Sequence, residues 1–304
     1  MKKTLFILLC LPMIGFGQQS KGYEKRPSAV PLGNIAKNNF VLISDVPSYL
    51  WHRGCGPTAL GMIIGYYDLH GFDDLFQDST LAQTNAINMS IASDEHYYNY
   101  SLPLDYYPNL LQDISETGFP HQDNSIADFM QTSKSSCGNY WGWSWSSDIG
   151  MAFEDYVFFK NSTYIATTDY EYYSNDSWNE YKMEIDNNRP VIILVDTDAD
   201  NSTDHFVVGI GYNDLSQEFA CYDTWDNNLH WYTWQEMSQG VNFGVYGFNK
   251  FNLYKPTTFI LEGTQVDKPY QIIDMLGRKT KHDKYQPLFY IYKDGSLEKK
   301  VIIE

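Results

Sequence analysis

The chain has 304 residues, a formal net charge of −17 at pH 7 and a sequence pI near 4.7. So acidic a chain is a poor electrostatic partner for nucleic acid or for an anionic membrane surface, and we expect neither. Its length predicts one large domain or one domain with appendages, and its 43% hydrophobic content is ample for a packed core.

The first residues are typical of a secretory signal peptide. A short basic start, Met1–Thr4, precedes an apolar stretch, Leu5–Phe16, that is too short to span a bilayer, and Gly17 offers a small residue for cleavage. We therefore predict a signal peptide over residues 1–17, no membrane span, and a secreted or cell-surface protein. Residues 18–39 are polar, and we predict that they form a linker or a short pro-segment.

The mature chain keeps three cysteines, Cys55, Cys137 and Cys221, because Cys10 lies within the signal peptide. Lipidation of Cys10 is disfavoured because that processing requires a small residue where Leu9 stands. An odd number of cysteines in an exported protein leaves a reactive thiol or an intermolecular bridge. A Cys137–Cys221 disulfide would leave Cys55 free, and a fully reduced chain is equally compatible with the sequence.

One cysteine lies at the predicted start of a buried helix. Glycines flank Cys55 on both sides, and apolar residues recur at roughly helical spacing from Ala59 to Tyr67. Pro57 falls in the first turn, where a helix tolerates proline. The helix dipole and unpaired N–H groups favour a thiolate there, and the glycines leave space for another chain's backbone to approach the sulfur. A buried structural cysteine is the alternative.

The remaining elements predict an α+β layout, with helices first and an antiparallel sheet afterwards. Their predicted ranges are a strand over Phe40–Ser44, helices near Leu110–Glu116, Ile126–Thr132, Asp148–Lys160 and Ser177–Asn187, and strands over Val191–Val195, Phe206–Tyr212, Glu218–Tyr222, Trp231–Trp234 and Gly244–Tyr254. Ser147 or Asp148 is the expected cap of its helix. Cys137–Trp145 alternates aromatic and small residues, as a strand or an extended cleft wall does. These elements form one domain over residues 40–255.

A thiol nucleophile needs a base, and the base needs a group that orients it. His205 opens a predicted strand 150 residues after Cys55, at the limit of the roughly 130–150 residues that papain-type cysteine peptidases use. Asp223 ends the next strand, where we expect its carboxylate to reach the imidazole, with Asp226–Asn228 as competitors. A surface histidine beside an acidic loop and a turn aspartate are the alternatives.

An acidic loop lies directly before His205. Its aspartates at alternate positions resemble the first half of a calcium loop, where carboxylates converge on a hard cation. The predicted ligands are Asp196, Asp198, Asp200 and Asp204. The loop is no EF-hand, because it lacks the glycine at its sixth position and has Val207 at its twelfth. We predict a structural calcium site with a solvated acidic turn as the alternative, and no cofactor for catalysis itself.

Several tryptophans are candidate walls of a cleft for an extended peptide. They are Trp51, Trp141, Trp143 and Trp225. Core packing is the alternative for each of them, because large aromatic side chains more often fill the interior.

Two motifs together resemble the papain-like cysteine peptidases of the bacteriocin-processing, C39-like type. They are Gly54-Cys-Gly-Pro-Thr-Ala59, which opens an apolar helix, and Asp204-His-Phe-Val-Val-Gly-Ile-Gly-Tyr212, which is followed by Cys221-Tyr-Asp223. The resemblance covers about Val41–Tyr254. It implies a papain-like two-layer fold and hydrolysis of a peptide or protein substrate through an acyl-thioester. By this resemblance Cys55 is the nucleophile, His205 the base and Asp223 its orienter.

The chain departs from that family at one place. The family usually has a glutamine about six residues before the cysteine, which donates to the oxyanion, and residues 46–52 contain none. We expect Tyr49 or His52 to donate beside the N–H of Cys55. Loss of one oxyanion donor typically costs about 10²–10³ in rate, so a weak or inactive binding module is one alternative. A Cys–His amidase or acyl transferase acting on a non-peptide amide is another.

Residues 256–304 turn basic, and we predict that they form a small separate β module. The Asp274-Met-Leu-Gly-Arg278 turn and the lysine-bearing terminal strand resemble the C-terminal sorting domains of the type IX secretion system. This resemblance implies the secretion machinery as a partner. It also implies a Gram-negative, Bacteroidota-like bacterium as the source.

Overall fold

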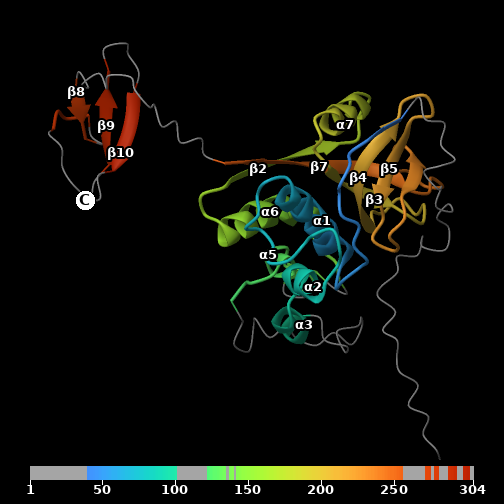
Figure 1. Ribbon diagram of the computed structural model, residues 1–304. Helices are drawn as coiled ribbons and strands as arrows, with labels where there is room; N and C mark the ends of the chain where they lie inside the picture. Colours follow the sequence, from blue (N-terminus) through green and yellow to red (C-terminus); the bar gives the residue numbers. More distant parts are fainter. Residues whose placement is uncertain are drawn as a thin grey trace, which may run out of the picture. The chain divides into compact units, whose positions relative to one another are not determined.

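The computed structural model describes residues 40–100, 122–134, 137–139, 142–255, 271–274, 277–280, 287–292 and 297–301. The chain divides into two compact units, Met1–Pro256 and Thr257–Glu304. In the first unit, helices pack on an antiparallel sheet (Figure 1). The predicted α+β class is therefore confirmed.

One helix in the described ranges, α1 (Cys55–Leu69), is fifteen residues long and begins at Cys55. The other helices of these ranges are α2 (Asn85–Ile91), α3 (Asp94–Tyr100), α5 (Ile126–Phe129), α6 (Ser146–Lys160) and α7 (Ser177–Asp186). No helix among the described residues is long and apolar enough to cross a membrane. The helix predicted near Leu110–Glu116 lies outside the described residues.

One antiparallel sheet forms the β part of this unit. Its strands are β1 (Phe40–Leu42), β2 (Ile165–Tyr172), β3 (Val191–Asp196), β4 (His205–Asn213), β5 (Glu218–Tyr222), β6 (His230–Thr233) and β7 (Gly244–Tyr254). The strand order is β2-β7-β3-β4-β5-β6, and β1 pairs with the end of β4 beyond its pairing with β3. β3 is buried along its whole length, which explains its unbroken apolar sequence.

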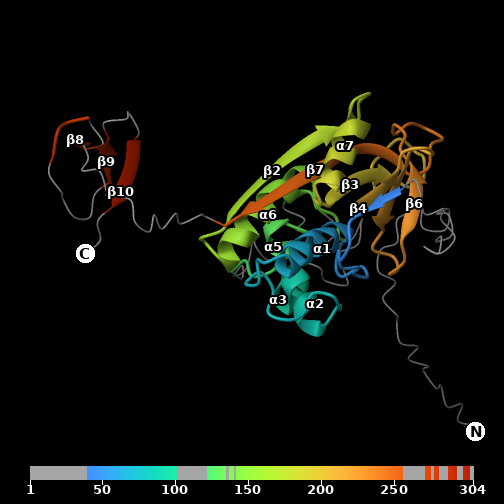
Figure 2. The ribbon, with the colours of Figure 1, turned by 45° about the horizontal axis from the view of Figure 1, so that its top comes forward.

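Both faces of the sheet are covered, as the alternation of side chains along β4 makes clear. A Cβ on Gly56 of α1 would lie 3.5 Å from the ring of Phe206, whereas a Cβ on Gly209 would lie 2.9 Å from the ring of Tyr181 in α7. Phe206 and Gly209 point to opposite faces, so α1 and α7 cover opposite sides of the sheet. Figure 2 shows α6 on the same side as α1 and α7 on the other. This layering brings the start of α1 against the start of β4.

Several elements differ from their sequence predictions. The described part of Cys137–Trp145 is not a strand, because Gly138 and Gly142 have φ of 77° and 86° and turn the chain. The N-cap of α6 is Trp145, with no side-chain cap, rather than Ser147 or Asp148. Three elements were not predicted at all: α2, α3 and the edge strand β2.

The second unit is a small antiparallel sheet of order β10-β9-β8. Its strands are β8 (Gln271–Ile273), β9 (Pro287–Ile291) and β10 (Leu297–Val301). After β8, the carboxylate of Asp274 accepts hydrogen bonds from the main-chain N and the Nε of Arg278, at 2.9 and 2.7 Å. These bonds close the turn that carries the sequence motif.

Candidate active site

Cys55 is the first residue of α1, and 7% of its surface is exposed. The helix has no side-chain cap, since Gly54 precedes it, and Thr58 instead donates its hydroxyl to the Gly54 carbonyl at 2.6 Å. The first N–H groups of a helix have no acceptor within the helix. The N–H groups of Cys55 and Gly56 therefore lie beside the sulfur with their partial positive charge unmatched by the helix.

The two glycines beside Cys55 serve the packing of this chain itself. A Cβ on Gly54 would lie 2.7 Å from the carbonyl oxygen of Gly142, and a Cβ on Gly56 would lie 2.8 Å from the Cε of Met130. The expectation that they leave space for another chain's backbone is therefore wrong. That space is already filled by residues of this chain.

The start of β4 lies against the cysteine. A Cβ on Gly56 would lie 3.5 Å from the ring of Phe206, and the main-chain N–H of Phe206 acts to lower the pKa of the Cys55 thiol. The residue before it, His205, opens β4 and is 2% exposed. The packing of α1 on β4 thus brings the segment that begins with Cys55 against the segment that begins with His205, although the two are far apart in the sequence.

The ring of His205 is held by a hydrogen bond at Nε2 and by stacking on one of its faces. Its Nε2 lies 2.7 Å from the main-chain oxygen of Asp223, and its face stacks on Trp225 at 4.1 Å between centroids with 15° between planes. Because a carbonyl oxygen only accepts, Nε2 carries the hydrogen, and Nδ1 is the basic nitrogen of the neutral ring. The predicted orienter therefore contacts His205 through its main chain, whereas we expected its carboxylate.

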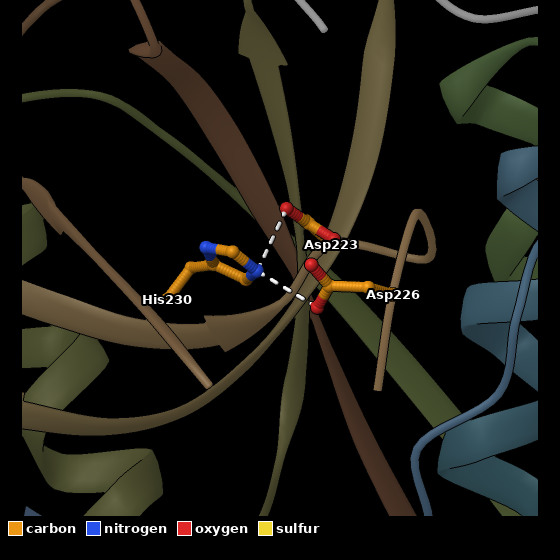
Figure 3. A group of neighbouring side chains, drawn as sticks. All are labelled: Asp223, Asp226 and His230. Carbon is orange, nitrogen blue, oxygen red and sulfur yellow. Dashed lines mark hydrogen bonds and ion pairs between the residues drawn. The ribbon is translucent and has the colours of Figure 1, made fainter. Parts of the chain in front are cut away.

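The carboxylate of Asp223 is engaged elsewhere. Its Oδ1 accepts from the main-chain N of Trp225 at 3.0 Å, and its Oδ2 lies 3.4 Å from Nε2 of His230 and 3.4 Å from the hydroxyl of Tyr232. The same Nε2 lies 2.9 Å from Oδ1 of Asp226, so one imidazole lies between two carboxylates (Figure 3). Asp226, a competitor for the orienting role, pairs with His230. Sequence reasoning did not single out His230, although it opens the strand next to β5.

The environment of Cys55 favours the neutral thiol. Burial raises the pKa of the Cys55 thiol to about 11, and the negative charge of Asp204 acts in the same direction. The N–H groups of Phe206, Gly56 and Cys55 itself act in the opposite direction and are outweighed. The expected thiolate is therefore not favoured at neutral pH, because desolvation of the sulfur exceeds the effect of the helix start.

Both predicted oxyanion donors contact main-chain carbonyls of this chain. Tyr49 is fully buried, donates its hydroxyl to the Thr80 carbonyl at 2.6 Å and lies against Gly65, ten residues along α1 from the nucleophile. The ring of His52 contacts the carbonyl of Ala92 through Nε2 at 3.3 Å, and burial lowers its pKa. The prediction for Tyr49 is wrong because ten residues of helix separate its hydroxyl from Cys55 by about 15 Å.

Three of the four predicted cleft tryptophans lie at the segments that carry Cys55 and His205. The main-chain N of Trp51 donates to the Thr224 carbonyl at 2.6 Å, Trp143 packs on Phe206 at 5.6 Å between centroids, and Trp225 stacks on His205. All three are partly buried and pack against the core. Trp141 lies outside the described residues.

The acidic loop before His205 is organised around Asp196. The buried carboxylate of Asp196 accepts from the main-chain N of Asp198, Ala199 and Asn201, at 3.2, 2.8 and 2.7 Å. One carboxylate oxygen each from Asp196, Asp198 and Asp200 lies within 4.8 Å of the others.

Asp204, the fourth predicted ligand, is not part of this group. Its carboxylate instead accepts from the main-chain N and the hydroxyl of Thr197, at 2.8 and 2.6 Å. Burial raises the pKa of Asp204 to about 6, and the nearby charges of Asp198 and Asp196 add to this shift.

The three cysteines of the described residues are free thiols. Cys221 is buried in β5, where burial raises its pKa, and Cys137 is half-buried in a turn. A Cys137–Cys221 disulfide, which the sequence left open, is not formed.

Comparison with known proteins assigns the chain to a family. The model of the Peptidase_C39 like family matches residues 43–250, which is more than half of the chain. A structure titled as xylellain, a cysteine protease from Xylella fastidiosa, is similar over 75% of this chain and 90% of that chain, with 12% identity and a TM-score of 0.36. No curated protein matches the sequence. The chain belongs to the Peptidase_C39 like family, and it is a cysteine-type peptidase.

Proposed function

We propose that this chain hydrolyses peptide bonds through an acyl-thioester on Cys55, with His205 as the base and Asp223 as its orienter. The observation that carries the proposal is the packing of the α1 start against the β4 start, where a Cβ on Gly56 would lie 3.5 Å from the ring of Phe206, the residue after His205. The bond from Nε2 to the Asp223 carbonyl supports it, because this bond makes Nδ1 the nitrogen that accepts a proton.

The reaction proceeds in two halves. The sulfur attacks the carbonyl carbon of the substrate while Nδ1 of His205 takes the thiol proton, and the resulting imidazolium gives that proton to the leaving amine. The thioester is then attacked by water, whose proton passes to Nδ1, and collapse of the second intermediate releases the acid and returns the proton to the sulfur. Because the pKa of Cys55 is raised to about 11, proton transfer accompanies the attack rather than preceding it.

The negative oxygen of the tetrahedral intermediate needs hydrogen-bond donors. The N–H groups of Cys55 and Gly56 at the first turn of α1 are suited to this role, since they have no acceptor within the helix and carry its positive end. They would act in place of the side chains of Tyr49 and His52.

A catalytically weak binding module is the second candidate. The observation that favours it is the burial of the Cys55 thiol together with the engagement of Tyr49 and His52 by the Thr80 and Ala92 carbonyls. One missing oxyanion donor reduces the rate by about 10²–10³. A module of this kind would bind peptide and turn it over slowly.

We also propose that the chain is exported to the cell surface or beyond, with residues 1–17 as signal peptide and the second unit as a partner of the type IX secretion machinery. The sequence of the N-terminus and of the Asp274–Arg278 turn supports this. Mass spectrometry of the mature protein tests it, since an N-terminus upstream of Gly17 contradicts the proposed cleavage.

The central experiment combines peptide cleavage with thiol labelling of the full mature chain. Peptide libraries, with products identified by mass spectrometry, should show cleaved amides for wild type and none for Cys55→Ser or His205→Ala. Cys137→Ser is the matched control and should remain active. Cleavage that persists in Cys55→Ser, or acyl transfer to an added amine in place of hydrolysis, contradicts the proposal. Peptide binding without measurable turnover supports the second candidate.

A further inference from the structure

Figure 3 shows a cluster of three side chains, of which His230 and Asp226 have no part in the reaction as proposed so far. Asp223 directly follows β5, His230 opens β6, and Asp226 lies in the loop between them. The exposed fractions of Asp223 and His230 are 0% and 2%. A buried carboxylate is costly unless donors satisfy it, so the ring of His230, between buried Asp223 and partly buried Asp226, stabilises this turn.

The turn contacts both halves of the active site. The main-chain oxygen of Asp223 accepts from His205, and the oxygen of the next residue, Thr224, accepts from the main chain of Trp51, four residues before the nucleophile. Thr224 has a φ of 64°, which is unusual for a β-branched residue. Its buried hydroxyl has no hydrogen-bond partner among the described residues.

Such a strained residue persists only where its surroundings determine its conformation. On one side the Asp223 carboxylate accepts from the main chain of Trp225 and contacts His230, and on the other side the Thr224 carbonyl is bound by Trp51. The direction of the Asp223 carbonyl therefore depends on the position of the Asp223 side chain, which is held by the main-chain N of Trp225, the hydroxyl of Tyr232 and the ring of His230.

We infer that His230, with Asp226, is a positioning residue for His205: it holds the Asp223 side chain so that the Asp223 carbonyl faces Nε2. This inference rests on the proposed role of Cys55 and His205. The donor chemistry disfavours a metal site in the same cluster, although one ligand atom from each residue lies within 4.8 Å of the others. A metal on Nε2 of His230 would leave an N–H on its buried Nδ1, which has no acceptor among the described residues.

The test measures carbamidomethylation of Cys55 by iodoacetamide in the full chain across pH, because the rate reports assistance by His205 without requiring a known substrate. His230→Leu removes the donor, whereas the amide of His230→Gln can still donate to both carboxylates. We expect His230→Leu to lower the rate at pH 7 by about tenfold and to change the pH profile, since a small misplacement of a catalytic group is costly. His230→Gln should retain most of the rate.

Arg189→Met is the matched control, because it breaks another partly buried pair, with Glu184 at 2.6 Å, and should leave the profile unchanged. A folded His230→Leu protein with the wild-type profile overturns the inference, and so does a His230→Gln protein as slow as His230→Leu. If His230→Leu shows no cooperative melting, Asp226→Ala replaces it, with a smaller decrease expected and an unchanged rate again contradicting the inference. Should His205→Ala label like wild type, the proposed function itself fails. If His205→Ala is labelled slowly while His230→Leu is labelled at the wild-type rate, only the positioning role of His230 is contradicted and the proposed function stands.

Discussion

Nε2 of His205 is bonded to the main-chain oxygen of Asp223 at 2.7 Å, while the carboxylate of the same aspartate faces His230. The residue predicted to orient the base thus contacts it through its main-chain oxygen, an atom that does not depend on the side chain. This relationship changes what substitution at position 223 should do.

Asp223→Asn should reduce activity far less than an orienting carboxylate would predict. The main-chain carbonyl that holds His205 remains, and an amide oxygen can still accept from Trp225, so we expect a loss of about tenfold. A triad in which the carboxylate itself orients the histidine loses about 10⁴ on this change. Asp223→Ala removes the side-chain contacts altogether and should therefore lower the activity more than Asp223→Asn does. A loss of several thousandfold in Asp223→Asn, measured as kcat/KM on a cleaved peptide, contradicts the main-chain role.

His205→Ala should expose the intrinsic acidity of Cys55. Burial raises the pKa of this thiol to about 11, so without the base the labelling rate should follow the thiolate fraction and rise about tenfold per pH unit from 7 to 10. At neutral pH the labelling rate of the wild-type protein should exceed that of the His205→Ala protein. A plateau below pH 8 in the His205→Ala protein would show that the sulfur is ionised after all.

Gly54→Ala should destabilise the protein because the new methyl group would lie 2.7 Å from the Gly142 carbonyl oxygen and 2.9 Å from the ring of Pro57. Overpacking of this kind typically costs about 1–3 kcal/mol in the free energy of unfolding. Gly150→Ala is the control, since its methyl group meets the Thr168 hydroxyl, a side-chain group that can rotate away. Urea unfolding should rank Gly54→Ala as the less stable variant, and equal stabilities would argue against the close approach.

The buried pair of His96 and Asp128 should make stability depend on acid pH. Burial alone would raise the pKa of Asp128, but hydrogen bonds from His96 and Ser125 and the charge of His96 lower it to about 2. A depressed carboxyl pKa contributes stability that is complete above about pH 4 and is lost as the pH falls towards 2. Its contribution is about 2 kcal/mol.

Asp128→Asn should remove that contribution at neutral pH and flatten the acid limb of a stability curve measured by urea unfolding. Asp214→Asn is the control, because Asp214 pairs with Lys182 on the surface and such pairs contribute little. An acid limb that is unchanged in Asp128→Asn assigns the pH dependence to other groups.

Calcium remains a prediction of the sequence, and thermal melting tests it. Added calcium should raise the Tm and a chelator should reverse this, because a cation relieves repulsion among Asp196, Asp198 and Asp200. Asp198→Ala should abolish the response, whereas Asp204→Asn should retain most of it, since Asp204 is bonded to Thr197 instead. A wild-type Tm that is indifferent to both additions ends the calcium hypothesis.

The elements with a strong periodic pattern could be predicted, and the exposed or short ones could not. β5 and β7 have the predicted bounds, and α1 starts at the predicted cysteine, because buried faces leave clear apolar periods. β2 was missed because it is an edge strand that is exposed at alternate positions. α2 and α3 have seven residues each, too few for a helical period to stand out.

In the site, the meeting of Cys55 with the strand of His205 could be expected from spacing and motif. The role of the Asp223 carbonyl could not, because a carbonyl's direction depends on the backbone dihedrals. The residue that follows this carbonyl, Thr224, has a positive φ that its residue type seldom adopts, so the sequence gives no signal of this turn. His230 was overlooked for a related reason: its partners are set by the pairing of Cys221 with His230 across β5 and β6.

The approach of Gly54 to Gly142 also has an evolutionary consequence. The carbonyl of one residue occupies the volume that a side chain on the other would need, so a larger residue at position 54 requires the loop at 142 to retreat. A side chain at position 54 would therefore disturb a loop almost ninety residues away in the sequence. Among divergent descendants of this chain, glycine should therefore persist at both positions.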